Sequence, residues 1–118
     1  MLSAAGRARR KGYPGHAIRL LSDLQARLPN SPEARASDIA LGMLQLQSGE
    51  ARAARAHLER YLQRSPRGAL AADSLWGQAQ ALFAQGNAVA ARASLSTLLE
   101  RYPSSAYASA ASAKLRAP

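Results

Sequence analysis

Two histidines and seven acidic residues are the side chains of this sequence that could carry acid–base or metal chemistry. His16 and His57 lie far apart in the chain, and we interpret both as partly exposed helix residues rather than catalytic groups or metal ligands. The acids are scattered among arginines, and helix termini and solvated faces account for them without a catalytic carboxylate pair. The sequence therefore predicts no catalytic, cofactor-binding or metal-binding residues.

Other motifs that carry chemistry are also missing. The chain has no cysteine, which excludes disulfides and thiolate metal sites. It has no glycine-rich loop that would cradle a phosphate, and no nucleophile elbow. We therefore expect a protein that is not an enzyme and that needs no cofactor.

The formal net charge is +9, and nearly all of the basic residues are arginines. Such a charge is compatible with nucleic acid, an acidic protein or anionic lipid as the partner. We interpret most of the arginines as a solvated helix exterior, in a composition that is also typical of a GC-rich genome. Nucleic-acid binding is the alternative, but it is disfavoured because aromatic residues are not interleaved with the basic ones.

The apolar segments are too short for a membrane span, which needs about 20 consecutive apolar residues. Behind Met1 there are small residues and then the basic cluster at 7–11, with no apolar stretch after it. No signal peptide is predicted at this start of the chain.

The elements that position all these side chains are predicted to be helices. Alanine, leucine and arginine are the commonest residues and strong helix formers, whereas β-branched residues are scarce. Aromatic residues make up only 5% of the chain, so the helices must pack closely over small side chains.

The sequence also repeats itself with a period of 37 residues. A residue type that recurs at a fixed spacing indicates a chain built from equivalent structural units, and each such set of equivalent positions is called a column below. Four residue types recur three times each at this spacing: Gly12, Gly49 and Gly86; Ala17, Ala54 and Ala91; Arg27, Arg64 and Arg101; Pro29, Pro66 and Pro103.

Each column has a structural task. Each unit is expected to contain two helices, a first and a second. The glycine ends the first helix by adopting the left-handed conformation. In the second helix the arginine complements the helix dipole in the last turn, and the proline behind it stops the helix. Behind each proline lies a short polar link, in which serine or asparagine, where present, can cap the next first helix. We expect these first helices at 34–48 and at 71–85. Small residues at Gly42 and Ala79 face Ala54 and Ala91, so the paired helices can cross closely.

This order of small residue, Gly, Ala, Leu and Pro resembles the tetratricopeptide repeat (TPR), and the resemblance covers nearly the whole chain. The small position of that family is occupied here by Ala5, Gly42 and Ala79. Two features differ from the family: its usual period is about 34 residues, and most of its first-helix aromatics are missing here. Residues 101–106 resemble the link of longer repeats in bacterial cell-envelope proteins, such as outer-membrane assembly lipoproteins, cell-division coordinators and anti-sigma regulators.

The resemblance implies an all-α fold, a right-handed α-α superhelix (a TPR-like solenoid) of about seven antiparallel helices. We expect one domain over residues 1–118, beginning inside a first helix at about 2–11. Its repeat units are expected at about 1–31, 32–68 and 69–105, with a terminal helix at 105–117. The compartment stays open between the bacterial periplasm or cell envelope and the cytoplasm.

The resemblance also implies a protein–protein interaction module, a scaffold or adaptor that binds a peptide or partner protein on the concave face lined by its first helices. Self-association through the ends of the array stays open as well. Carried onto this chain, the residues that line the concave face are Ile39, Met43, Gln47, Asp73, Trp76, Gln80 and Phe83.

Trp76 and Phe83 lie two turns apart on one helix face, and Met43 is expected beside them on the neighbouring helix. An aromatic and methionine groove suits an apolar or amphipathic peptide. The alternative is that Trp76 and Phe83 are core residues that pack under the next helix pair.

Overall fold

The structure is a computed structural model, and it describes residues 14–27 and 31–117. Within these residues the chain is all-helical, which confirms the predicted all-α, TPR-like helical repeat fold. The helix predicted at 2–11 lies outside the described residues. The described helices are α2 (Pro14–Arg27), α3 (Pro32–Gln47), α4 (Ala51–Arg64), α5 (Ala71–Ala84), α6 (Ala88–Arg101) and α7 (Ala108–Arg116).

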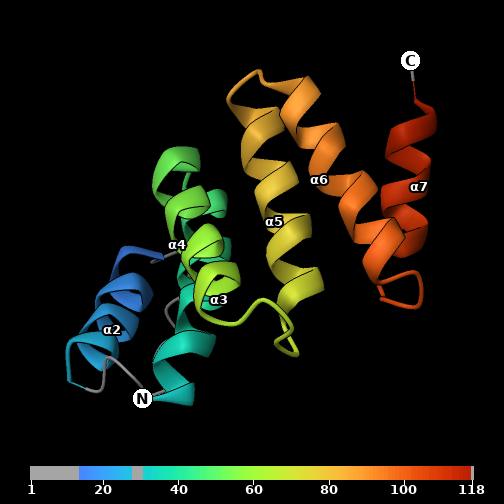
Figure 1. The fold of residues 1–118 in the computed structure, drawn as a ribbon. Coiled ribbons are helices and arrows are strands. Elements are labelled where there is room, and N and C mark those ends of the chain that lie inside the picture. The colour runs from blue at the N-terminus through green and yellow to red at the C-terminus, as the bar shows by residue number, and fades with distance from the viewer. Residues whose placement is uncertain (1–13, 28–30, 118) are drawn as a thin grey trace.

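The helices are stacked side by side in chain order, from α2 at one end of the array to α7 at the other (Figure 1). Each first helix, α3 or α5, is followed by a second helix that returns alongside it, α4 or α6. Successive first helices α3 and α5 also contact each other directly. Among the described residues, no helix combines the length and the hydrophobicity that crossing a membrane requires.

The repeated glycines and arginines perform their predicted tasks at the helix ends. Gly49 and Gly86 follow α3 and α5 with φ angles of 79° and 78°, a region that favours glycine. Arg27, Arg64 and Arg101 occupy the last turns of α2, α4 and α6, at the negative end of each helix dipole. The sequence therefore determines where these helices end.

The start of α3 also agrees with its predicted cap. The Ser31 side chain accepts a hydrogen bond of 3.0 Å from the main-chain N–H of Ala34, and Pro32 is the first residue of the helix. The last helix, by contrast, begins at Ala108 rather than at 105. The Ser105 hydroxyl accepts a hydrogen bond from the Tyr107 N–H at 3.2 Å, which holds the preceding residues in a turn.

Leu58 of α4 packs into the space left by two glycines of the first helices. A Cβ on Gly42 of α3 would lie 2.6 Å from Leu58 Cγ, and one on Gly77 of α5 would lie 2.8 Å from Leu58 Cδ1. The same Gly42 Cβ would lie 3.2 Å from the main-chain oxygen of Ala54, in agreement with the predicted close crossing of α3 and α4. The missing side chains let α4 approach both α3 and α5.

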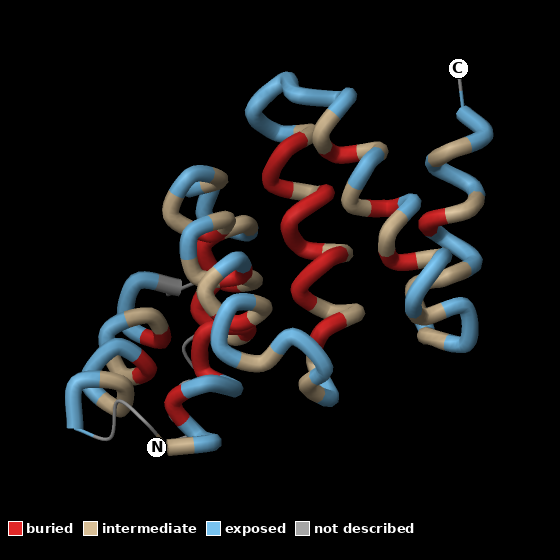
Figure 2. The backbone as a smooth tube through the Cα atoms, in the orientation of Figure 1, coloured by how far each residue is buried: buried red, intermediate tan, exposed pale blue. Residues whose placement is uncertain are grey.

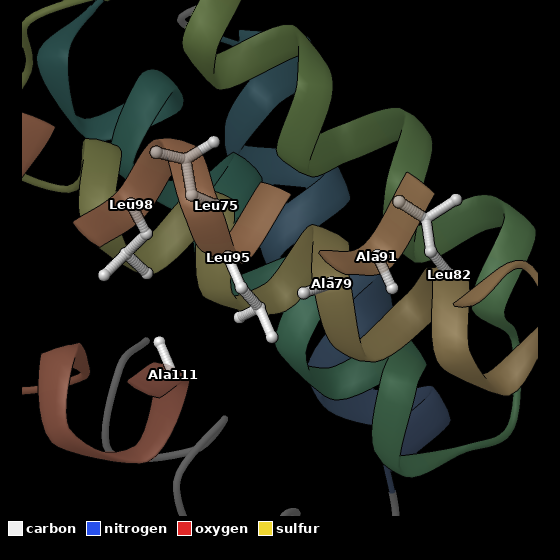
Figure 3. Packing of buried hydrophobic residues seen from close by; sticks show 7 residues of the cluster. All are labelled: Leu75, Ala79, Leu82, Ala91, Leu95, Leu98 and Ala111. Atoms are coloured by element: carbon white, nitrogen blue, oxygen red, sulfur yellow. The ribbon is translucent and has the colours of Figure 1, made fainter. Parts of the chain in front are cut away.

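Buried residues line the interfaces between successive helices instead of forming one thick centre (Figure 2). The repeated alanines Ala17, Ala54 and Ala91 are fully buried, one in each second helix. The largest apolar cluster joins α5, α6 and α7 (Figure 3). Its buried members are Leu75, Ala79, Leu82, Ala91, Leu95, Leu98 and Ala111.

The interface of α2, α3 and α4 contains a buried polar network. The fully buried Asp38 carboxylate accepts hydrogen bonds from Arg60 Nη2 at 2.6 Å and from Gln25 Nε2 at 2.7 Å. Arg60 Nη2 also donates to Gln25 Oε1 at 3.1 Å. Each polar group therefore has a partner, as burial of a charge requires.

Candidate interaction surface

Two contacts of aromatic rings connect α5 with α7 and with the residue that directly precedes α7. The indole ring of Trp76 stacks on the phenol ring of Tyr107, with centroids 5.5 Å apart and planes at 18°. The Lys114 Nζ atom lies over the Phe83 ring, 5.1 Å from its centroid. The residues of both pairs are the same number of positions apart in the sequence, so the two contacts follow one another along α5 and α7.

Asp73, in the first turn of α5, holds the first of these contacts in place. The Tyr107 hydroxyl donates a hydrogen bond to Asp73 Oδ2 at 2.9 Å. Burial of the phenol, and then the hydrogen bond to Asp73 and its negative charge, raise the pKa of Tyr107 above the ordinary value. The phenol therefore remains protonated, and it remains a donor to Asp73, at neutral pH.

The second contact lies at a surface hollow of about 530 Å³ between the end of α5, the start of α6 and the end of α7. The Arg92 guanidinium donates hydrogen bonds to the main-chain oxygens of Lys114 and Leu115, at the negative end of the α7 dipole. Two cations and one aromatic ring thus meet at this hollow, and none of its described lining residues is an acid. The lining residues are Phe83, Ala88, Arg92, Lys114 and Ala117.

The structure corrects the expectation for Ile39. Its side chain is only 7% exposed and packs with Leu58 and Tyr61 of α4. Ile39 therefore lies on the side of α3 that faces its own second helix, and it belongs to the core rather than to the surface.

Three other residues expected on the concave face keep some exposed surface. Met43 is half-buried, and its methyl group approaches α5: a Cβ on Gly77 would lie 3.0 Å from Met43 Cε. Gln47 is exposed at the end of α3, and Gln80 is half-buried on α5. Met43 thus lies next to α5, whereas Gln47 lies at the rim of the array.

Trp76 and Phe83 have features of both environments that the sequence left open, the apolar core and the concave surface. Both rings pack against the apolar cluster of α5, α6 and α7, and both retain exposed surface. Their partners were not among the predicted residues: Tyr107 directly precedes α7, and Lys114 lies in it. The equal sequence separation of the two pairs is the one signal that could have pointed to them, and it is visible only once α5 and α7 are known to be neighbours.

The imidazole ring of His57 makes contacts within the helix array. Its Nδ1 atom lies 2.9 Å from Oε1 of Gln45 in α3, a contact that connects α4 with α3. The same atom lies 3.2 Å from the main-chain oxygen of Ala53 in its own helix. In the part of the chain that the structure describes, no three His, Cys, Asp or Glu side chains are grouped as a metal ion would need.

The arrangement of helices can be compared with known families. A family model described as YfiO, outer membrane lipoprotein, matches residues 2–117, which is nearly the whole chain. No curated protein matches the chain. The family match and the helical array together support the TPR-like helical repeat superfamily predicted from the sequence.

Proposed function

The chain belongs to the YfiO family of outer membrane lipoproteins, and from this premise we propose that it is a non-enzymatic scaffold that binds a partner protein through its first helices. The proposed contact surface comprises the predicted residues that keep exposed surface: Met43, Gln47, Asp73, Trp76, Gln80 and Phe83.

The observation that carries this proposal is the exposure of aromatic side chains along α5. Tyr61 is buried, but Trp76 and Phe83 keep exposed surface although the chain has few aromatic residues with which to fill its core. Partly exposed aromatic side chains on a rigid helix are typical anchors of protein interfaces, because they bury a large area at a small cost in side-chain entropy.

The family description supports the cell envelope as the compartment, in preference to the cytoplasm. We also retain the proposed division into units of about 1–31, 32–68 and 69–105 with a terminal helix at 105–117. The pairs α3–α4 and α5–α6 support the two central units.

Nucleic acid is not the partner that we propose. Binding of single-stranded nucleic acid relies on aromatic faces that are free to stack on bases. One face of Trp76 is covered by Tyr107, and Phe83 lies under Lys114.

Site-specific photo-crosslinking in the bacterial envelope tests the proposal. Gln80→p-benzoylphenylalanine places the crosslinker on the proposed face, and Gln63→p-benzoylphenylalanine places it on the exposed side of α4 as a matched control. We expect a discrete protein adduct from position 80 and none from position 63. Adducts of equal yield at both positions, or no adduct at position 80, would overturn the proposal.

A further inference from the structure

The hollow at the ends of α5, α6 and α7 has cations that no acid of the described chain neutralises. Ion pairs among the described residues join Arg55 to Glu59 and Arg60 to Asp38, and neither pair involves Arg92 or Lys114. Lys114 is exposed, and its ammonium group contacts only the Phe83 ring among charged or aromatic groups that the structure describes. The hollow is therefore open to an anionic group from outside.

Arg92 is held in a fixed orientation at this hollow. Its guanidinium hydrogen bonds to the Lys114 and Leu115 carbonyls at the end of α7, so its position depends on main-chain atoms rather than on a flexible side chain. A guanidinium group has five N–H donors, so donors remain for a further acceptor. A carboxylate is an acceptor that matches this geometry well.

The hollow also has an apolar part. Phe83, Ala88 and Ala117 contribute to its lining, and Val89 follows Ala88 in the first turn of α6. Val89 is 84% exposed, and it is the one large hydrophobic side chain of the described residues that is exposed to this extent. A small free anion would leave this apolar surface uncovered, whereas a segment with both acidic and apolar side chains would cover it.

We propose that this hollow binds an acidic, amphipathic segment of a partner protein. A carboxylate of that segment pairs with Lys114 and Arg92, and an apolar side chain beside it packs on Phe83 and Val89. A volume of about 530 Å³ accommodates a few side chains of an extended or helical segment. This inference rests on the proposed function, and it specifies the chemistry of the partner.

A random dodecapeptide library displayed on phage provides the probe. We expect selection against the protein to enrich sequences that combine Asp or Glu with Leu, Ile or Phe. The most enriched peptide is then synthesised with a fluorescent label, and its Kd is measured by fluorescence anisotropy. Lys114→Gln is expected to weaken binding about three- to fivefold, the effect of losing one exposed ion pair. Lys114→Glu is expected to weaken it by about tenfold or more, because like charges then face each other.

Arg116→Gln is the matched control, since it removes the same charge from the same helix at a residue that does not line the hollow. We expect its Kd to equal that of the wild type. Val89→Ser tests the apolar part and should weaken binding, and its high exposure means that the melting temperature should not change. Circular dichroism melting curves verify that each variant is folded.

Three outcomes overturn the inference: no enrichment of acidic peptides, equal weakening by Lys114→Gln and Arg116→Gln, or self-association of the wild type that Lys114→Glu abolishes. The last result would identify a second copy of the chain as the occupant. If position 80 crosslinks a partner and Lys114→Glu leaves that adduct unchanged, the proposed function holds and this inference fails alone.

Discussion

The ring of Trp76 in α5 stacks on the ring of Tyr107, the residue that precedes α7, with 5.5 Å between their centroids. This contact connects two first helices from successive repeats, and Asp73 fixes it from the side through the Tyr107 hydroxyl. The stack therefore stabilises the end of the array and also shapes the surface proposed for a partner. Its two roles can be separated by substitution.

Tyr107→Ala should expose the indole of Trp76 and destabilise the protein. An aromatic pair contributes about 0.5–1.5 kcal/mol beyond the area that it buries, so we expect a loss of about 1–2 kcal/mol for this half-buried ring. Because Trp76 is the only tryptophan, its emission should shift to longer wavelength. Urea unfolding and emission spectra measure the two effects.

Tyr107→Phe is the control for that experiment. It retains the ring but removes the hydrogen bond to Asp73, so we expect a loss of about 1 kcal/mol and an unchanged emission maximum. An unshifted emission maximum in Tyr107→Ala would contradict the stacked arrangement.

The raised pKa of Tyr107 predicts a dependence of stability on alkaline pH. Since the folded-state pKa lies above the unfolded value of about 10, the stabilisation from the protonated phenol is complete below pH 10 and is lost as the pH rises through the folded-state pKa. The ultraviolet titration of the wild type minus that of Tyr107→Phe should show one tyrosine that ionises above the ordinary value.

Asp73→Asn should lower that pKa without returning it fully to the ordinary value, because burial of the phenol is the largest cause of the shift. A midpoint at or below about 10 in the difference titration of the wild type minus Tyr107→Phe would show that the pKa of Tyr107 is not raised.

Gly42→Ala and Gly77→Ala should each destabilise the protein by about 1–3 kcal/mol, although alanine is the better helix former. The physical reason is overlap of the new Cβ with the Leu58 side chain, which lies between the two glycines. Chemical denaturation measures the change in unfolding free energy. Gly15→Ala in α2 is the control: a Cβ there meets no atom of the other described parts of the chain within 4 Å, so its unfolding free energy should be unchanged or slightly higher.

Removing Arg60 should cost more than removing its partner Asp38. Arg60→Leu leaves the fully buried Asp38 carboxylate without its cation, at a cost of about 3 kcal/mol or more. In Asp38→Leu the Arg60 side chain, which is 40% exposed, can return to water, so we expect a smaller loss. Equal losses in the two variants, measured by urea unfolding, would show that the asymmetry of burial has no effect on stability.

The following repeat shows which residues could replace the buried polar network of Gln25, Asp38 and Arg60. The positions equivalent to Gln25, Asp38 and Arg60 hold Leu62, Leu75 and Thr97, and Leu75 lies in the apolar cluster there. The triple variant Gln25→Leu, Asp38→Leu, Arg60→Thr should therefore recover most of the stability lost in Arg60→Leu, since a buried ion pair can often be replaced by apolar residues without loss. A triple variant less stable than Arg60→Leu would contradict this expectation.

The 37-residue period was sufficient to predict the class of fold and most of the helix ends. A helix ends through residues within about one turn of its terminus, so a residue type that recurs at a helix end acts in the same way in each unit where the structure describes it. Gly49 and Gly86 illustrate this, since both adopt nearly the same φ angle. The start of α7 is the exception, because a local turn at Ser105 competes with the helix.

Only the tertiary structure decided which side chains meet. Asp38 and Arg60 pair at positions where the next repeat has apolar or uncharged residues, so the period gives no sign of their contact. Trp76 meets Tyr107 in another repeat unit, and Ile39 turns to its own second helix instead of the surface. Repetition determines the backbone because helix formation is local, whereas side-chain contacts depend on residues from different units that the repeat does not keep constant.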